Sequence, residues 1–178
     1  MKIILLRHEE RGYDISFFSN LVENGIIRAC TTLPKELQKL KPDIIFSSPF
    51  IRTLQTIYPY SQKNNIKINV EYGLYEYMHN PYFLLGQWYY TLDDIKDNDL
   101  KTIINNNYKS IVDKNDFSIL EDENDLEKRI NKFMNNFKIN YPNKTILLVT
   151  HKGIINKIKN VSMNSEFPMG HYEILNFT

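Results

Sequence analysis

The chain has one cysteine, almost no net charge and no long hydrophobic run, and each of these shortages excludes a class of protein. Cys30 cannot form an internal disulfide alone, so a reducing, cytoplasmic setting is expected. A formal charge of +1 gives no broad cationic field, so nucleic acid is not expected as a partner. Only four apolar residues separate Lys2 from Arg7, too few for a signal peptide or a membrane span, and no later run is longer. A membrane partner is therefore not expected either.

The 178 residues, of which 42% are hydrophobic, predict one core and a single domain over residues 1–178. Short apolar, β-branched runs predict strands at 2–6, 44–46, 66–70 and 145–149. Apolar residues at helical spacing predict helices at 33–40, from Ser48 through Tyr58, at 126–137 and at 154–158. The first helix is expected to start at Thr32 as its cap, with Pro34 in its first turn. This alternation predicts a three-layer α/β/α sandwich with a mainly parallel central sheet.

Residues 80–122 interrupt the alternation. They are rich in tyrosine, aspartate and asparagine and contain Trp88, so an irregular helical insertion is expected here. Long insertions often cover active sites, which favours a lid-like role. A surface elaboration that packs its own aromatic side chains is an equally open interpretation.

Polar residues follow three of the predicted strands at the point where each strand ends. Arg7 and His8 follow the first strand, Ser48 and Arg52 follow the second, and His151 follows the last. Because the carboxyl ends of parallel strands meet at one edge of a sheet, these side chains should converge. The helix starts expected after Ser48 and His151 would direct backbone N–H groups at the same crevice and favour an anion.

Four segments carry a resemblance to a known family. In chain order they are Leu5–His8, Ser47–Thr56, Gly73–Glu76 and Val149–Gly153. Together they resemble the signature segments of the histidine phosphatase superfamily, also called the phosphoglycerate mutase-like family, and the match spans nearly the whole chain. The surroundings of the third segment, Val70–Tyr77, resemble the subgroup related to the Sts-type protein phosphatases.

The resemblance implies a phosphatase in which His8 is the nucleophile. A neutral imidazole can attack phosphorus when a hydrogen bond to its other nitrogen fixes the tautomer. Arg7, Arg52 and His151 are implied to hold the phosphoryl group through charge-assisted hydrogen bonds. A phosphohistidine would form, and water would then release phosphate. Because these side chains supply the positive charge, neither a metal nor an organic cofactor is expected.

The departing alkoxide needs a proton, and the resemblance assigns its donation to Glu76, which matches the position of the family's acid. Glu71, Glu9 and Asp14 are the rival carboxyl groups. Arg11 lies just past the first motif, where the family often carries a polar or basic residue. A contact between Arg11 and the phosphate or the rest of the substrate is one of two open readings.

Two positions depart from the family pattern. Glu9 stands where the family usually has a glycine after the nucleophile, and Lys152 stands where it usually has a small residue. Glu9 brings negative charge towards an anion site, so a non-catalytic phosphate- or phosphopeptide-binding module is an alternative function. A pairing of Lys152 with Glu9 would offset part of that charge. His79 and His171 are expected to be structural or solvent-facing, because no metal-ligand spacing joins them.

A sugar-phosphate mutase is the other alternative. Cofactor-dependent phosphoglycerate mutases carry an arginine-rich segment before the last motif, whereas the insertion of this chain carries lysines such as Lys96, Lys101 and Lys109, which favours hydrolysis. The expected partner is a phosphorylated small molecule or a phosphoprotein, and the oligomeric state is left open. Aromatic residues could line a pocket for a ring-bearing substrate or form the insertion's own core. They are Tyr72, Tyr75, Tyr77, Tyr82, Trp88, Tyr89 and Tyr90.

Overall fold

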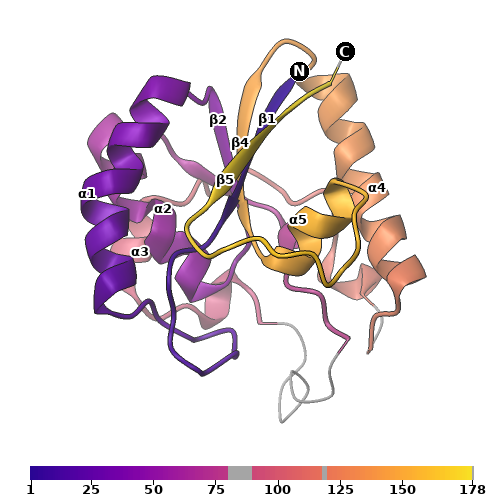
Figure 1. Cartoon of the computed structure of the whole chain (residues 1–178), viewed down its shortest axis with the longest axis horizontal. Coiled ribbons are helices and arrows are strands. Elements are labelled where there is room, and N and C mark those ends of the chain that lie inside the picture. Colours follow the sequence, from indigo (N-terminus) through magenta and orange to yellow (C-terminus); the bar gives the residue numbers. More distant parts are fainter. Residues whose placement is uncertain (80–89, 118–119, 178) are drawn as a thin grey trace.

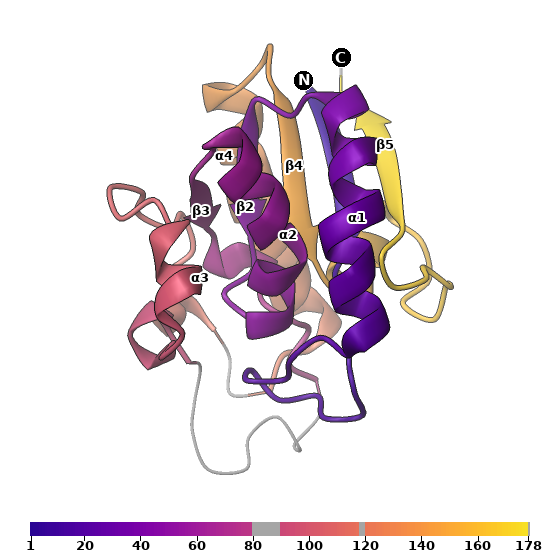
Figure 2. The same cartoon turned by 90° about the vertical axis from the view of Figure 1, so that its left-hand side faces the viewer.

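The computed structural model describes residues 1–79, 90–117 and 120–177. Among these residues, five strands form one sheet. They are β1 (Lys2–Arg7), β2 (Ile44–Ser47), β3 (Ile68–Val70), β4 (Thr145–Thr150) and β5 (Tyr172–Asn176). The strand order is β3-β2-β4-β1-β5; β1 to β4 run parallel and β5 pairs antiparallel with β1. Figure 1 labels β1, β2, β4 and β5, and Figure 2 labels β3. The expected α/β fold with a mainly parallel sheet is confirmed.

The middle of the sheet is apolar on both faces, which explains why its strands read as continuous hydrophobic runs. Ile3 and Leu5 of β1 pack into one core cluster, and Ile4 and Leu6 pack into another on the opposite face. All four side chains are fully buried. A parallel strand buried on both faces can deliver polar residues only where it ends, and β1 ends at Arg7.

Helices cover the two faces of the sheet. They are α1 (Glu23–Leu40), α2 (Ile51–Asn64), α3 (Asn98–Thr102), α4 (Glu123–Asn140) and α5 (Lys152–Ile158). Figure 1 shows α1 and α2 on one side of the sheet and α4 and α5 on the other, and Figure 2 shows α1 beside α2. Within the described ranges, no helix is both long enough and apolar enough to span a membrane.

The start of α1 differs from the expectation. The helix begins at Glu23 and not at residue 33, so Thr32 and Pro34 lie in its interior and not at its start. One stripe of buried residues four apart holds the helix on the sheet. These residues are Gly25, Ala29, Leu33 and Leu37. At Gly25 a Cβ atom would lie 2.2 Å from the carbonyl oxygen of Glu10, so only glycine permits this close approach. Packing therefore outweighs the local signal of the proline.

Two other boundaries shift by a few residues. α2 begins at Ile51 after Phe50, whose φ of −59° and ψ of 138° are not helical, and not directly after Ser48. β3 begins at Ile68 and not at 66. The expected apolar stripe of α4 is buried as predicted. Its members are Leu126, Ile130, Phe133, Met134 and Phe137.

The described part of the insertion is irregular and helical, as expected. It contains the 3₁₀ turns η3 (Leu92–Asp94) and η4 (Lys114–Asp116) and the short helix α3. Ile95 and Leu100 bury their side chains in the core cluster that also contains α2. Tyr82, Trp88 and Tyr89, which the lid prediction also involves, lie outside the described residues. Another 3₁₀ turn, η1 (Tyr72–Leu74), follows β3 and leads the chain towards the sheet edge described next.

Candidate active site

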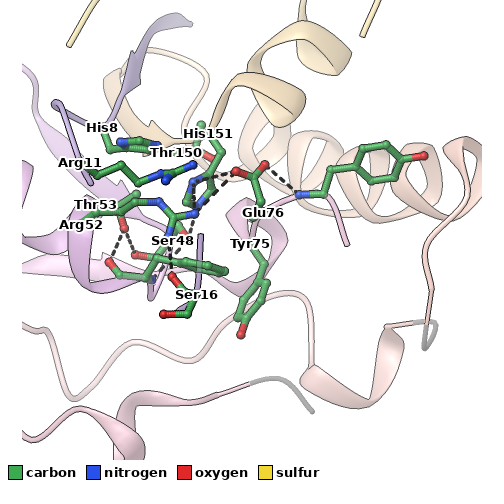
Figure 3. Close-up of polar contacts among 12 residues, drawn as sticks. His8, Arg11, Ser16, Ser48, Arg52, Thr53, Tyr75, Glu76, Thr150 and His151 are labelled. Carbon is green, nitrogen blue, oxygen red and sulfur yellow. Dashed lines mark hydrogen bonds and ion pairs between the residues drawn. The ribbon is translucent and has the colours of Figure 1, made fainter. Parts of the chain in front are cut away.

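The carboxyl ends of β1, β2 and β4 bring the expected residues together at one edge of the sheet (Figure 3). Arg7 ends β1 in register with the last residue of β4, so His8 and His151 follow on neighbouring strands. The ring centroids of these two histidines lie 5.4 Å apart in an edge-to-face arrangement. Arg52 reaches the same place from the first turn of α2, and Glu76 reaches it from the segment after η1.

His8 is buried and held in one orientation. Its Nδ1 lies 2.8 Å from the backbone carbonyl oxygen of Glu9, so Nδ1 carries the proton and donates it to that oxygen. Nε2 is then the nitrogen with the available lone pair. Burial, followed by the positive charge of Arg52, lowers the pKa of His8 well below its usual value. A buried imidazole that stays neutral is suited to nucleophilic attack.

His151 is fully buried and lies between Ser48 and Arg52. Its Nε2 is 2.9 Å from the Ser48 hydroxyl oxygen, and its Nδ1 is 3.2 Å from a terminal nitrogen of Arg52. A guanidinium can only donate, so in the tautomer in which Nδ1 accepts from Arg52, Nε2–H donates to Ser48. Burial first, and then the charge of Arg52, lowers the pKa of His151 well below the usual value.

Arg52 links the parts of the site. Its side chain is 1% exposed, and one terminal nitrogen donates to the carbonyl oxygen of Ser16 over 2.8 Å. The guanidinium carbon lies 4.2 Å from the centre of the Phe50 ring, which adds a cation–π contact. Burial lowers the pKa of Arg52 to about 10, and the nearby Glu76 carboxylate opposes this shift. Arg52 therefore stays charged at neutral pH.

Glu76 places a carboxyl group beside both histidine and arginine. Its Oε2 lies 3.3 Å from Nδ1 of His151 and 3.6 Å from a terminal nitrogen of Arg52. Its Oε1 accepts a hydrogen bond from the backbone N–H of Tyr77 over 3.0 Å. The Glu76 side chain is 20% exposed, so it lies at the boundary between the buried site and solvent.

Arg7 and Arg11 add two further positive charges. Arg7 donates to the carbonyl oxygen of Phe167 over 2.5 Å, and Arg11 donates to the carbonyl oxygens of Gly12 and Asp14 over 2.6 and 2.9 Å. Burial lowers the pKa of Arg7, while the Glu76 carboxylate raises it. The Arg11 charge contributes to the lowered pKa values of both site histidines, and Figure 3 shows its side chain alongside His8. The site thus has a strong excess of positive charge over one carboxylate.

Of the rival carboxyl groups, Glu71 is fully buried and already engaged. It accepts hydrogen bonds from Gly73 N, Tyr108 Oη, Ser110 Oγ, Ile111 N and Val112 N. These bonds anchor part of the insertion to η1. Asp14 instead accepts from the backbone N–H and hydroxyl of Ser16 in an exposed loop. The geometry therefore favours Glu76 over both as a proton donor.

The expected pairing of Glu9 with Lys152 is wrong. The Glu9 carboxylate lies 3.1 Å from Nε of Arg28 on α1, and Lys152 lies 3.8 Å from Glu166. Burial raises the pKa of Glu9, and Arg28 opposes the shift. A Cβ atom at Gly170 would lie 2.3 Å from the Glu9 carboxylate, so the carboxylate fills the space above a glycine with a φ of 71°. One carboxylate oxygen of Glu9 is thus paired with Arg28, and the carboxylate lies against Gly170.

The lowered pKa values of the two buried histidines should make the free energy of unfolding depend on pH. Both pKa values are lower in the folded chain than the usual 6.5, so the unfolded chain binds more protons as the pH falls. The corresponding stability is fully present above about pH 6.5 and is lost on acidification below it. The measurement is the free energy of unfolding in urea at pH 7.5 and at pH 5. On this acidification, His8→Asn should lose less of that free energy than the wild type loses, by on the order of 1 kcal/mol. An equal loss in the two proteins would contradict this account.

One residue with a bearing on the site was not identified from the sequence. Arg129 on α4 is 5% exposed and donates to the backbone around Glu76. The sequence could have indicated its burial. Arg129 follows Leu126 by three residues and precedes Phe133 by four, and this helical spacing places it on the apolar stripe of α4. Charged residues are rarely fully buried unless they are paired, so such a position indicates a specific role.

The arrangement suits an anion with several oxygens. Forked guanidinium donors and imidazoles match phosphoryl oxygens, and a neutral imidazole such as that of His8 has the chemistry of a nucleophile. Within the described part of the chain, no group of three or more histidine, cysteine, aspartate or glutamate side chains could hold a metal ion. The fold and the site therefore define an α/β protein that gathers two buried histidines and a buried arginine at the carboxyl edge of its sheet.

Comparison with known proteins identifies the family. The family model of the histidine phosphatase superfamily (branch 1) matches residues 3–171, so the chain belongs to this superfamily. The comparison with curated proteins found no significant match.

Several solved structures share the fold. The ecdysone phosphate phosphatase of Bombyx mori, solved with tungstate, is 14% identical with a TM-score of 0.69, covering 99% of this chain and 89% of that one. A phosphoserine phosphatase variant from Entamoeba histolytica, solved with phosphoserine, is 18% identical with a TM-score of 0.64, covering 99% and 91%. A mycobacterial glucosyl-3-phosphoglycerate phosphatase is 17% identical with a TM-score of 0.66, covering 98% and 89%. At these identities the likeness establishes the shared fold, and these neighbours are phosphatases.

Proposed function

We propose that the chain is a phosphomonoesterase that works through a phosphohistidine on His8. The single observation that carries the proposal is the orientation of His8: its Nδ1–H is bonded to a backbone carbonyl, and its buried ring has a lowered pKa. This leaves a neutral Nε2 lone pair among the site arginines. A histidine with a merely structural role has no need of such a cationic setting.

Arg7, Arg52 and His151 hold the phosphoryl group in the proposed reaction. Arg11 is assigned a supporting contact, because its charge acts on the same histidines. A bound phosphoryl dianion favours protonation of His151, which then becomes a further donor. The positive charges stabilise the negative oxygens as the transferring group moves between the leaving oxygen and Nε2.

In the first step, the Nε2 lone pair of His8 forms a bond to phosphorus while the bond from phosphorus to the ester oxygen breaks. Glu76, which enters this step in its protonated form, gives its proton to the departing oxygen and becomes a carboxylate, so the product leaves as an alcohol or phenol. In the second step, water attacks the phosphohistidine, Glu76 takes a proton from it, and phosphate leaves with His8 restored. No metal or organic cofactor enters either step of the proposal.

The test is to trap the intermediate. Wild-type protein mixed with a ³²P-labelled phosphomonoester and quenched in alkali within milliseconds to seconds should carry label that acid releases and alkali does not, as expected of a phosphohistidine. Hydrolysis of a generic aryl phosphate is measured in parallel. Turnover of that aryl phosphate without any trapped label at all quench times would rule against His8 as the nucleophile.

The contacts of Glu9 favour hydrolysis over the non-catalytic binding module. That alternative depended on negative charge facing the phosphate, whereas the Glu9 carboxylate contacts Arg28 and lies against Gly170. The module predicts phosphate binding without a phosphoenzyme. A mutase would instead move phosphate between positions of a substrate, and the same labelled assay distinguishes that outcome by its product.

We also propose that residues 1–178 form one domain with a lid-like insertion at 80–122. Within the superfamily, we place the chain nearest the Sts-type protein phosphatases, because Val70–Tyr77 resembles the corresponding segment of that subgroup. The substrate is a phosphorylated small molecule or a phosphoprotein. A cytoplasmic setting is supported only by the lone Cys30.

A further inference from the structure

A buried ion pair lies behind the proposed acid and makes no contact with the phosphoryl-binding side chains. Arg129 of α4 and Glu121 are 5% and 4% exposed. Nε and a terminal nitrogen of Arg129 each lie 2.6 Å from a different carboxylate oxygen of Glu121, so the pair is bidentate. The guanidinium carbon also lies 5.0 Å from the centre of the Phe117 ring.

The remaining donors of Arg129 reach one short stretch of backbone. They bond to the carbonyl oxygens of Gly73 at 2.9 Å, Tyr75 at 2.8 Å and Glu76 at 3.4 Å. Three carbonyl groups within four residues are thus held by one guanidinium, and the last belongs to the residue that carries the proposed acid. The planar fork of arginine allows this, whereas a lysine ammonium has no such fixed geometry.

Glu121 holds the same stretch from its other side. Its carboxylate accepts a hydrogen bond from the backbone N–H of Met78 over 3.0 Å, and its own backbone N–H donates to the Met78 carbonyl oxygen over 3.0 Å. Contacts at residues 73, 75, 76 and 78 therefore bracket the Glu76 side chain. The ion pair fixes where the Cα atom of Glu76 lies and how its side chain leaves the backbone.

Stability alone does not account for this pair. Removing two charges from water is costly, and well-packed apolar residues often give equal or greater stability at such positions. The neighbours of Arg129 on the buried stripe of α4 are apolar. Arg129 is charged and donates to the backbone next to Glu76. A role in positioning the Glu76 side chain, which must transfer a proton in the proposed reaction, explains this better than stability does.

We propose that Arg129, oriented by Glu121, is a positioning residue that holds Glu76 at the distance needed to protonate the leaving oxygen. This inference rests on the proposed function, because it assigns Arg129 to the proton-transfer part of that reaction. Proton donation matters most for poor leaving groups such as alkoxides and least for acidic phenols. Loss of positioning should therefore depend on the leaving group.

The experiment measures kcat/KM for a series that runs from an alkyl phosphate to aryl phosphates of increasingly acidic phenols. This parameter covers the steps up to phosphoryl transfer to His8, where the leaving group departs. For Arg129→Lys, we expect kcat/KM to fall about 10- to 100-fold with the alkyl phosphate and less than about threefold with the most acidic phenol. Glu121→Gln keeps the arginine, so it should lower kcat/KM by a smaller factor, with the same dependence on the leaving group.

The matched control is Phe137→Leu, which alters the buried face of the same helix without touching the Glu76 backbone. Phe137 is fully buried and packs its ring 4.4 Å from that of Phe46. This variant should lower the melting temperature while leaving the leaving-group dependence as in the wild type. A parallel change in Phe137→Leu would overturn the inference, because general loosening of α4 would then explain the effect.

Glu76→Gln separates the two levels of the proposal. If Glu76→Gln shows the leaving-group dependence while folded Arg129→Lys and Glu121→Gln do not, the positioning role is wrong and the proposed reaction stands. If Glu76→Gln shows none, the assignment of the acid fails, and this inference fails with it. The inference also requires that Arg129→Lys, introduced into Glu76→Gln, lowers kcat/KM by less than about a further twofold. Such non-additivity is expected when the two residues act through one step.

Discussion

His8→Ala is expected to lower kcat/KM for an aryl phosphate by at least about 10⁴-fold. The variant removes the proposed nucleophile, and His151 is not placed to replace it, because it is bonded through Nε2 to Ser48 and through Nδ1 to Arg52. Attack by water alone would lack the covalent route. Steady-state hydrolysis at neutral pH, with a sensitive fluorogenic ester, measures the loss.

Binding of inorganic phosphate distinguishes this effect from collapse of the site. His8→Ala retains Arg7, Arg52 and His151, so calorimetric titration should give a phosphate Kd within about tenfold of the wild-type value. His171→Ala is the matched control, because His171 is exposed and its backbone contacts do not need the ring. Its activity should stay within about twofold of the wild type. Substantial hydrolysis by His8→Ala would remove histidine from the role of nucleophile.

Arg52→Met should cause the second largest loss, about 10²- to 10³-fold in kcat/KM. Methionine keeps much of the apolar stem but removes the charge and every donor. The Ser16 carbonyl, His151 and the Glu76 carboxylate would each lose a buried partner at once. Arg52→Lys should also lose at least about tenfold, because one ammonium cannot reach these three groups in a fixed geometry.

The accompanying measurement is the affinity for orthovanadate as a competitive inhibitor. Since Arg52 is assigned to the phosphoryl group, both substitutions should weaken inhibition along with kcat/KM. Lys157→Met is the control for the loss of one positive charge, because Lys157 pairs with Glu127 on the surface of the molecule, at 2.8 Å. Unchanged vanadate inhibition in folded Arg52→Met would contradict the role of Arg52 in binding.

The central strands and the convergence of the site were predictable because both follow from burial. β1 and β4 are covered on both faces, so their apolar runs identified them, and polar residues could follow only at their ends. Parallel pairing then brings His8 and His151 to the same edge whatever their separation along the chain. The four motif segments added Arg52 and Glu76 to the expected site through the resemblance to a family, and the structure places both beside His151.

Features that depend on contacts between distant residues were not predictable in the same way. The start of α1 depends on the close approach of Gly25 to the backbone of Glu10, which no local pattern displays. The direction of the Glu9 carboxylate depends on Arg28 and on the space above Gly170. A pairing inferred from charge alone therefore selected the wrong cation.

The antiparallel strand β5 has a consequence for the integrity of the whole sheet. It pairs with Lys2–Leu6 of β1, the strand that leads into His8, and the loop before it supplies the Phe167 carbonyl that receives Arg7. Loss of β5 would turn an apolar interior strand into an unprotected border, open to association with other chains. β5 thus covers the edge of the strand that leads into His8, and the loop before β5 holds Arg7 at the end of the same strand.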